Sequence, residues 1–426
     1  MSRWTMSANL ELNQAVERLN AGGADILNLA FGESRLPVLA SLADLLAAAA
    51  HETAYGPVAG TPAVRDAAAG FFGRRGLPTD PEQVIVTPGS KPLLMAVQLV
   101  AGGDVLLPQP CWNSYAPQAR MAGRTPITVP IPRECGGVPD PAALRAAIRT
   151  ARARGLDPRL LICTLPDTPT GTVAPPDLVR AVCEIAEEAD LTVLSDEIYR
   201  DTLHDVRTPL LSPAEVLPHR TVVTTGLSKS LALGGWRIGL GRFPAGALGE
   251  RIRAGVLAVA SDLWSTLARP MQEAAGYAFG DPPEIRHRLA ASARLHGAVA
   301  RTLHSIMVAA GARCRPPTGA FYVYPDFEPL RAPLAGLGIT DSPSLQQYLL
   351  DEYDISVLAG HQLGDDAGAL RFKAATSMLY GHTDEEQHAA LASTDPVSLP
   401  HIRRTMTRIE TALADLHARC RAEPVG

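Results

Sequence analysis

The sequence predicts an α/β protein with a mainly parallel seven-stranded sheet in a large domain, followed by a smaller α/β domain. Short β-branched runs alternate with Ala-, Leu- and Arg-rich helical stretches along the first part of the chain. A long helical pattern then begins at Pro283, and a second, shorter set of strands and helices follows it. The chain has 426 residues, 46% of them apolar, which is enough for two or three globular domains.

Seven apolar runs are expected to form the strands of the large sheet. They are Val84–Thr87, Asp104–Leu107, Ile127–Ile131, Leu160–Thr164, Thr192–Ser195, Thr221–Thr225 and Ile238–Arg242. Helical patterns occupy the segments around them, at Thr61–Gly73, Pro92–Val100, Pro141–Ala153 and Pro176–Ala189. Alternation of this kind favours parallel strands with helices on both faces of the sheet.

The pattern from Pro283 to about Ala310 is a helix that leaves the sheet domain. Beyond it the sequence predicts strands at Ala320–Tyr324, Ile355–Leu358 and Ala369–Ala374, and helices at Ser344–Asp351 and near Ile402–Arg419. We therefore expect a large domain at 47–285 and a small domain at 286–426. The N-terminal segment 1–46 is expected to pack on the small domain.

Composition excludes several classes of function. The formal net charge of −5 disfavours nucleic-acid binding, which needs a basic surface. No apolar run approaches the roughly 18 residues of a membrane span, and the N-terminus lacks the apolar core of a secretory signal. The six scattered cysteines form no C-x-x-C pair, so we expect no metal site and a reduced, cytoplasmic location.

Lysine is rare in this chain. Only Lys91, Lys229 and Lys373 are lysines, against 36 arginines. A coding bias explains the ratio, but a retained lysine is a candidate for amine chemistry that arginine cannot supply. Lys229 follows the Thr221–Thr225 strand, at the edge where parallel sheets bind ligands. Lys91 lies at a strand-to-helix turn, and Lys373 is expected on a strand with a solvated side chain.

A lysine amine can hold an aldehyde cofactor as a Schiff base, and pyridoxal 5'-phosphate is the commonest such cofactor. That cofactor needs a carboxylate at its ring nitrogen. Asp196 ends an apolar strand 33 residues before Lys229, and Tyr199 could donate a hydrogen bond to the ring phenolate oxygen. Taken singly, an aspartate such as Asp196 is more often a helix N-cap, and a tyrosine such as Tyr199 is more often an ordinary packed residue.

The phosphate needs an anion site, and three features could provide it. The turn Gly89-Ser90-Lys91 opens a helix whose first N–H groups are free. Ser228 precedes the reactive lysine, and Arg237 carries a planar fork that could hold two phosphate oxygens. By itself, a glycine turn of this kind is more often an ordinary turn.

Two further residues complete the set. Trp112 follows the Asp104–Leu107 strand and could stack on the cofactor ring, although a core position is the alternative. Arg371 is the candidate for the substrate carboxylate, in the late strand that begins near Ala369. One arginine among 36 is weak evidence when it is taken alone.

The set resembles the fold-type I pyridoxal-phosphate enzymes, specifically the class I/II aminotransferases of the aspartate aminotransferase superfamily. The Asp196-Glu-Ile-Tyr199 and Ser228-Lys229-x₆-Trp-Arg237-Ile-Gly segments are the most specific. The resemblance implies that Gly32, in Leu29-Ala-Phe-Gly-Glu, lies near the substrate carboxylate. It also implies a homodimer in which Tyr55 reaches the phosphate of the neighbouring subunit.

One departure from the family concerns the cofactor ring. The family usually reads Asn-Pro-x-Asn-Pro-Thr-Gly where this chain reads Leu165-Pro-Asp-Thr-Pro-Thr-Gly, so Thr168 replaces the ring-contacting asparagine. A hydroxyl can still donate one bond to the phenolate oxygen, but it is shorter than an amide. Cofactor and substrate binding are both expected to respond at Thr168.

The resemblance implies an aminotransferase that acts on an L-amino acid and a keto acid, with Lys229 removing the Cα proton. The alternative is β/γ-elimination or replacement in specialised metabolism, like the aminocyclopropane-carboxylate synthases that use S-adenosylmethionine, and Thr168 motivates it. A non-catalytic cofactor-binding regulator is the third possibility, but only about 50 residues precede Tyr55 and none forms a basic helix-turn-helix pattern. The sequence does not identify the substrate.

Overall fold

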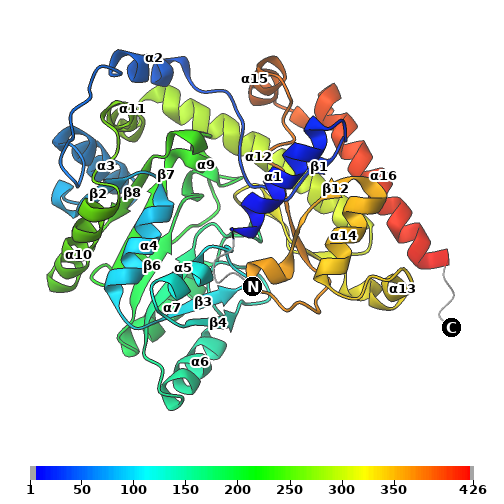
Figure 1. Cartoon of the computed structure of the whole chain (residues 1–426), viewed down its shortest axis with the longest axis horizontal. Coiled ribbons are helices and arrows are strands. Elements are labelled where there is room, and N and C mark those ends of the chain that lie inside the picture. Colours follow the sequence, from blue (N-terminus) through cyan, green and yellow to red (C-terminus); the bar gives the residue numbers. More distant parts are fainter. Residues whose placement is uncertain (1–5, 423–426) are drawn as a thin grey trace.

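A seven-stranded sheet forms the centre of the large domain in the computed structural model, which describes residues 6–422 (Figure 1). Its strand order is β2-β8-β7-β6-β5-β3-β4, and only β8 runs antiparallel to its neighbours. This confirms the predicted mainly parallel sheet. The strands are β2 Val84–Thr87, β3 Asp104–Gln109, β4 Pro126–Pro130, β5 Pro158–Thr164, β6 Thr192–Asp196, β7 Thr221–Gly226 and β8 Gly239–Arg242.

Helices cover both faces of this sheet, as the alternation predicts. Successive strand residues enter different cores: Val193 packs with α6 and α7, whereas Leu194 packs with α4, α5 and α10. The helices α3 and α11 extend the first of these faces over β2, β7 and β8. The helices are α3 Pro62–Arg74, α4 Ser90–Ala101, α5 Tyr115–Met121, α6 Pro141–Ala153, α7 Pro176–Glu188, α8 Pro213–Val216, α9 Leu227–Ser230, α10 Ala247–Leu263 and α11 Arg269–Gly280.

Local chemistry explains why several helices begin where they do. The Thr61 side chain accepts a hydrogen bond from the Val64 N–H, and the Asp140 side chain accepts one from the Ala143 N–H. In both helices the first residue is proline, which has no N–H to leave unpaired. The predicted helix bounds are therefore close to those in the structure.

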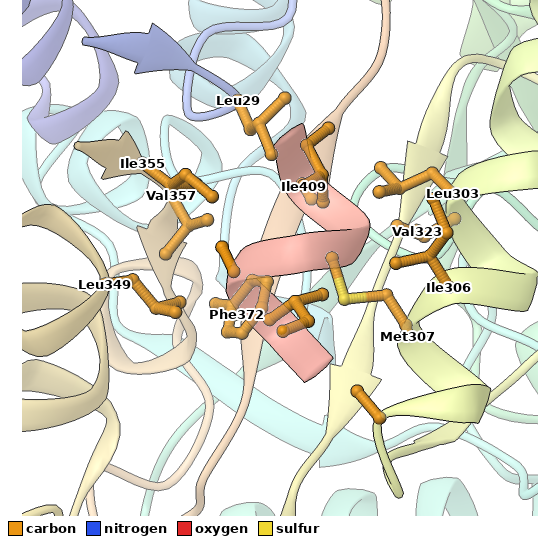
Figure 2. Packing of buried hydrophobic residues seen from close by; sticks show 14 of the residues in the cluster. Leu29, Leu303, Ile306, Met307, Val323, Leu349, Ile355, Val357, Phe372 and Ile409 are labelled. Atoms are coloured by element: carbon orange, nitrogen blue, oxygen red, sulfur yellow. The ribbon is translucent and has the colours of Figure 1, made fainter. Parts of the chain in front are cut away.

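The long helix α12 Pro283–Ala309 joins the two domains. Ile285, near its start, packs in the large domain, whereas Leu303 belongs to the core of the small domain. That second core gathers Leu303, Val323, Phe372 and Ile409 from elements far apart in the sequence (Figure 2). The remaining elements are α13 Arg331–Gly336, α14 Ser342–Tyr353, α15 Asp384–Ala392, α16 Pro400–Ala422, β9 Arg313–Cys314, β10 Tyr322–Val323, β11 Pro325–Asp326, β12 Ile355–Ser356, β13 Leu358–Ala359 and β14 Phe372–Ala375.

The N-terminal segment divides between the domains. Helix α1 Ala8–Ala21 leads to β1 Leu27–Asn28, which pairs in parallel with β12 of the small domain. Helix α2 Ala40–Ala48 packs instead on α11, because Leu42 is buried in the large-domain core. The domain division at 46/47 and 285/286 stays a prediction, and residues 1–5 and 423–426 of its outer segments lie outside the described residues. Within 6–422, no helix combines the length and apolarity that crossing a membrane requires.

Candidate active site

The candidate site lies at the carboxyl ends of β6 and β7, which are adjacent in the sheet. Asp196 is the last residue of β6 and pairs in register with Thr224 of β7. The chain leaves β7 at Gly226 and turns into the short helix α9, which carries Lys229. Asp196 and Lys229 both line one cavity of about 380 Å³. The sequence predicted this position from the rule for ligands in parallel sheets.

The cavity gathers nearly all of the predicted site residues. Those that line it are Gly32, Ser90, Lys91, Trp112, Thr168, Asp196, Tyr199, Ser228, Lys229 and Arg237. Gly89 lies directly behind this lining, next to Arg237. Tyr55 and Arg371 do not line the cavity.

Lys229 is the reactive candidate, and its environment lowers the pKa of its amine. Its Nζ donates a hydrogen bond to the Gly32 carbonyl oxygen at 2.5 Å. Desolvation lowers the pKa of Lys229 to about 8, and the positive charge of Arg237 acts in the same direction, whereas the Glu33 carboxylate opposes it. This amine therefore loses its proton more readily than an ordinary lysine does.

Asp196 is buried and held by two donors. The Tyr115 hydroxyl donates to Oδ2 at 2.8 Å, and the Ile198 N–H donates to Oδ1 at 3.3 Å. Burial raises the pKa of Asp196 to about 6, although the Tyr115 hydrogen bond opposes that shift. The sequence analysis gave Tyr115 no role. Its position three residues after Trp112 was the available signal.

Tyr199 is neutral in this site. Its hydroxyl lies 2.6 Å from the Tyr322 hydroxyl, and its ring meets Phe321 edge-on with centroids 5.6 Å apart. Burial raises the pKa of Tyr199 well above its ordinary value. Tyr199 can therefore act as a hydrogen-bond donor inside the cavity.

An anion cradle forms where α4 begins. Gly89 precedes the first helical residue with a φ of 86°, and a Cβ added there would lie 2.3 Å from Nη2 of Arg237. Lys91 faces the same place, and its pKa is lowered by burial and by the charge of Arg237. No carboxylate of the described residues forms an ion pair with Lys91 or Arg237. The cradle therefore has unneutralised positive charge at a helix N-terminus.

Trp112 supplies a flat surface at the edge of this cradle. The Lys91 Nζ lies 5.2 Å from the centroid of its ring, and Tyr115 contacts the ring edge-on with centroids 5.2 Å apart. The indole is half-buried and lines the cavity. Thr168, which replaces the expected asparagine, is 5% exposed and lines the same cavity.

Lys373 corrects the sequence analysis, which expected a solvated side chain. The residue is 4% exposed, lines the cavity with Lys229, and holds its Nζ 5.2 Å from the centroid of the Tyr322 ring. Burial, together with the charge of Lys229, lowers its pKa to about 7. The signal was alternation: Phe372 and Ala374 enter the small-domain core, so Lys373 must face the other way.

Arg371 and Tyr55 lie elsewhere. The Arg371 guanidinium pairs with Asp326 at 3.1 Å and with Asp365 at 3.3 Å, and it lines a separate cavity of about 1140 Å³. Asp326 comes from a distant segment, whereas Asp365 lies in the loop just before the Arg371 strand, and the sequence pattern alone did not pair either one with Arg371. Tyr55 is 89% exposed on the surface of the single chain.

Comparison with known proteins then decides the family. Residues 24–391 match the family model described as aminotransferase class I and II. The chain belongs to the class I and II aminotransferase family. It is similar to an aspartate/prephenate aminotransferase of Thermus thermophilus, with 32% identity over 76% of this chain and 82% of that protein. It is also similar to an aspartate/prephenate aminotransferase of Cereibacter sphaeroides, with 31% identity over 85% of this chain and 90% of that one.

A solved structure agrees with this assignment. The structure of aspartate aminotransferase from Thermus thermophilus with maleate superimposes with a TM-score of 0.79 at 27% identity, covering 93% of this chain and 99% of that one. This aminotransferase therefore has the aspartate aminotransferase fold, and its relatives do not favour elimination or replacement. Members of the family depend on pyridoxal phosphate.

The cavity fits that cofactor. It carries four cationic side chains, from Lys91, Lys229, Arg237 and Lys373, against the two carboxylates of Asp196 and Glu33. A dianionic phosphate would balance the cations around α4, where Gly89 leaves room that a Cβ would fill. The buried Asp196 carboxyl would meet a ring nitrogen, which is a group able to share a proton with it.

Proposed function

We propose that this aminotransferase holds pyridoxal 5'-phosphate at Lys229 and moves the α-amino group of an L-amino acid to a keto acid. The observation that carries the proposal is the cavity in which Lys229 and Asp196 meet, at the ends of adjacent strands and beside the α4 cradle. Each requirement of the cofactor has a residue within this one cavity.

Two groups of residues would hold the cofactor, one at its phosphate and one at its ring. The phosphate would lie at Gly89, Ser90, Lys91, Ser228 and Arg237. The ring would lie against Trp112 with its nitrogen toward Asp196, and Tyr199 and Thr168 would donate to the phenolate oxygen. When bound, the cofactor supplies an electron sink for negative charge at the substrate Cα.

Lys229 would act as the base and acid of the transfer. Its Nζ would accept the proton from the substrate Cα and would donate it to the cofactor carbon. The lowered pKa of Lys229 makes the neutral amine available for the first of these transfers. Asp196 would stay ionised and keep a proton on the ring nitrogen. Its pKa of about 6 implies that this function weakens as the pH falls below that value.

The amino donor, the assembly and the location are further parts of the proposal. Because the relatives above are named for aspartate and prephenate, L-aspartate is the first donor to test. The exposed Tyr55 supports a homodimer in which this tyrosine completes the phosphate site of the partner subunit. Buried thiols such as Cys111 and Cys163 support a reducing, cytoplasmic compartment.

A panel assay tests the proposed function. Purified protein with added pyridoxal phosphate is mixed with each of a panel of L-amino acids, beginning with L-aspartate, and with 2-oxoglutarate as the acceptor. We expect a visible absorbance band of bound cofactor, a change in that band with at least one amino acid, and L-glutamate formed in equal amount to the new keto acid. Lys229→Ala should lose all three signals. Keto acid formed with release of ammonia or of a side-chain fragment, and without glutamate, would support elimination and overturn the proposal.

A further inference from the structure

Lys373 reaches the cavity from the small domain, opposite the residues of the large sheet. The residues before and after it are buried in the small-domain core, so the alternation of β14 turns Lys373 toward the cavity. Its Nζ lies 5.2 Å from the centroid of the Tyr322 ring. The Tyr322 hydroxyl in turn lies beside Gly32, whose carbonyl oxygen accepts the hydrogen bond from Lys229. Lys373 and Lys229 therefore flank one contact, that between Tyr322 and Gly32.

The hydroxyl groups that would face the phenolate oxygen of the cofactor meet at Tyr322. The Tyr199 and Tyr322 hydroxyls lie 2.6 Å apart, and the Thr168 side chain also hydrogen-bonds to Tyr322. Each hydroxyl has one proton to donate and carries no charge. Burial raises the pKa of both tyrosines, so both stay neutral near physiological pH. An anion at this place finds neutral donors, and a full positive charge has to come from another side chain.

Lys373 supplies an uncompensated positive charge on this side of the cavity. Among residues 6–422, no carboxylate forms an ion pair with Lys373, and no hydrogen bond of its Nζ is found. Burial and the nearby charge of Lys229 lower the pKa of Lys373 to about 7. An ammonium group taken out of water without a partner is costly, so an anion that enters the cavity beside Lys373 would favour its charged form.

The other charged groups that line the cavity each have a place already. Two cations face the α4 cradle, one carboxylate would meet the ring nitrogen, one amine would bind the cofactor aldehyde, and one carboxylate pairs with the exposed Arg35 at 3.1 Å. In that order these groups belong to Lys91, Arg237, Asp196, Lys229 and Glu33. Of the two negative groups of the cofactor, the phosphate thus has its cations, and the phenolate oxygen has none. Lys373 is the cation that remains.

We propose that Lys373 stabilises the phenolate oxygen of the bound cofactor and makes the nitrogen through which Lys229 holds that cofactor easier to deprotonate. The inference rests on the proposed function, because it requires the cofactor in this cavity. A nearby cation favours the ionised phenolate oxygen, which then attracts the proton on the adjacent nitrogen less strongly. The neutral donors Tyr199 and Thr168 position the oxygen, and Lys373 supplies the charge that they lack.

A pH titration of the cofactor absorbance, with pyridoxal phosphate at saturation, tests this assignment. The visible band changes when the nitrogen loses its proton, so the midpoint of the titration reports the pKa of that nitrogen. We compare wild type with Lys373→Met and Lys373→Gln. Arg288→Met is the matched control, because Arg288 is 8% exposed and forms no ion pair within residues 6–422 but does not line the cavity. The melting temperature of each variant reports folding.

A second titration separates the phenolate oxygen from the rest of the cofactor. Fluorescence measures the affinity of each protein for pyridoxal phosphate and for the analogue whose phenolic oxygen is methylated and cannot ionise. Both Lys373 variants should bind pyridoxal phosphate at least about fivefold more weakly than wild type does. Their affinity for the methylated analogue should change by less than about twofold.

We expect both Lys373 variants to keep the cofactor band and to raise its midpoint by at least about one pH unit, whereas Arg288→Met should leave the midpoint unchanged. Unchanged midpoints in both Lys373 variants would overturn the inference alone. An equal loss of affinity for the two cofactors would also overturn it, because Lys373 would then act on the phosphate or on the fold. So would loss of the band at saturating cofactor in both Lys373 variants. A wild type that shows no cofactor band would instead overturn the proposed function.

Discussion

Replacing Tyr115 with phenylalanine should weaken the protein in a pH-dependent way. The substitution removes the hydroxyl that donates to Asp196 Oδ2 at 2.8 Å and that lies 2.9 Å from Thr164 Oγ1. A buried hydrogen bond to a charged acceptor contributes about 1.5–3 kcal/mol, and one to a neutral acceptor about 0.5–1.5 kcal/mol. The value of the lost bond therefore depends on whether Asp196 is ionised.

The sign follows from the pKa of Asp196, which is about 6 because of burial. At pH 8 the carboxylate is ionised and loses a strong donor, whereas at pH 5 it is mostly protonated and loses a weaker contact. The loss of unfolding free energy in Tyr115→Phe should thus be about 1 kcal/mol larger at pH 8 than at pH 5. Since about 1.4 kcal/mol corresponds to one pH unit, the same change raises the pKa of Asp196 by about 1.

Urea unfolding of the cofactor-free protein, followed by circular dichroism at both pH values and one protein concentration, measures this difference. Tyr353→Phe is the matched control, because its hydroxyl donates to the exposed Asp415 at 2.8 Å. The control should lose the same small amount of unfolding free energy at pH 5 and at pH 8. If Tyr115→Phe lost the same unfolding free energy at both pH values, or more at pH 5, the link between Tyr115 and an ionisable Asp196 would be refuted.

Three other changes have defined outcomes. Gly89→Ala should lower the affinity for pyridoxal phosphate at least about tenfold, because the new Cβ would lie 2.3 Å from Arg237 Nη2. Fluorescence titration measures this affinity. The control Gly73→Ala, which has open space around its Cβ, should bind the cofactor as wild type does. Acetylation of Lys229 in the cofactor-free protein, followed by mass spectrometry, should accelerate as the pH rises through about 8, and acceleration only near pH 10 would contradict the lowered pKa. Gly32→Ala should lower the melting temperature by the equivalent of about 1–3 kcal/mol, because its Cβ would lie 2.1 Å from the Tyr322 hydroxyl, and an unchanged melting temperature would contradict that contact.

The large sheet could be predicted because its strands are short, apolar and separated by helical patterns. The end of β6 and the helix after β7 then placed Asp196 and Lys229 at one edge, since the carboxyl ends of parallel strands share that edge. Local sequence carried this information, and no contact between distant segments was needed.

The small-domain side of the site was harder to predict because its residues depend on long-range partners. Arg371 turns away because Asp326 and Asp365 attract it, and Asp326 comes from a distant part of the sequence. Lys373 is buried because two domains close around it, although strand alternation alone would have turned it from the core. The hydrophobic pattern of a strand shows which of its faces is buried in a core, but it does not show which face contacts another domain.

Mapping the cofactor-bearing lysine tests the central claim most directly. The complex with pyridoxal phosphate is reduced with borohydride and digested with trypsin, and the peptides carrying Lys91, Lys229 and Lys373 are compared by mass spectrometry. The account predicts a stable cofactor adduct at Lys229 alone. An adduct at Lys91 or Lys373 in place of Lys229, or no adduct on any of the three lysines, would contradict it.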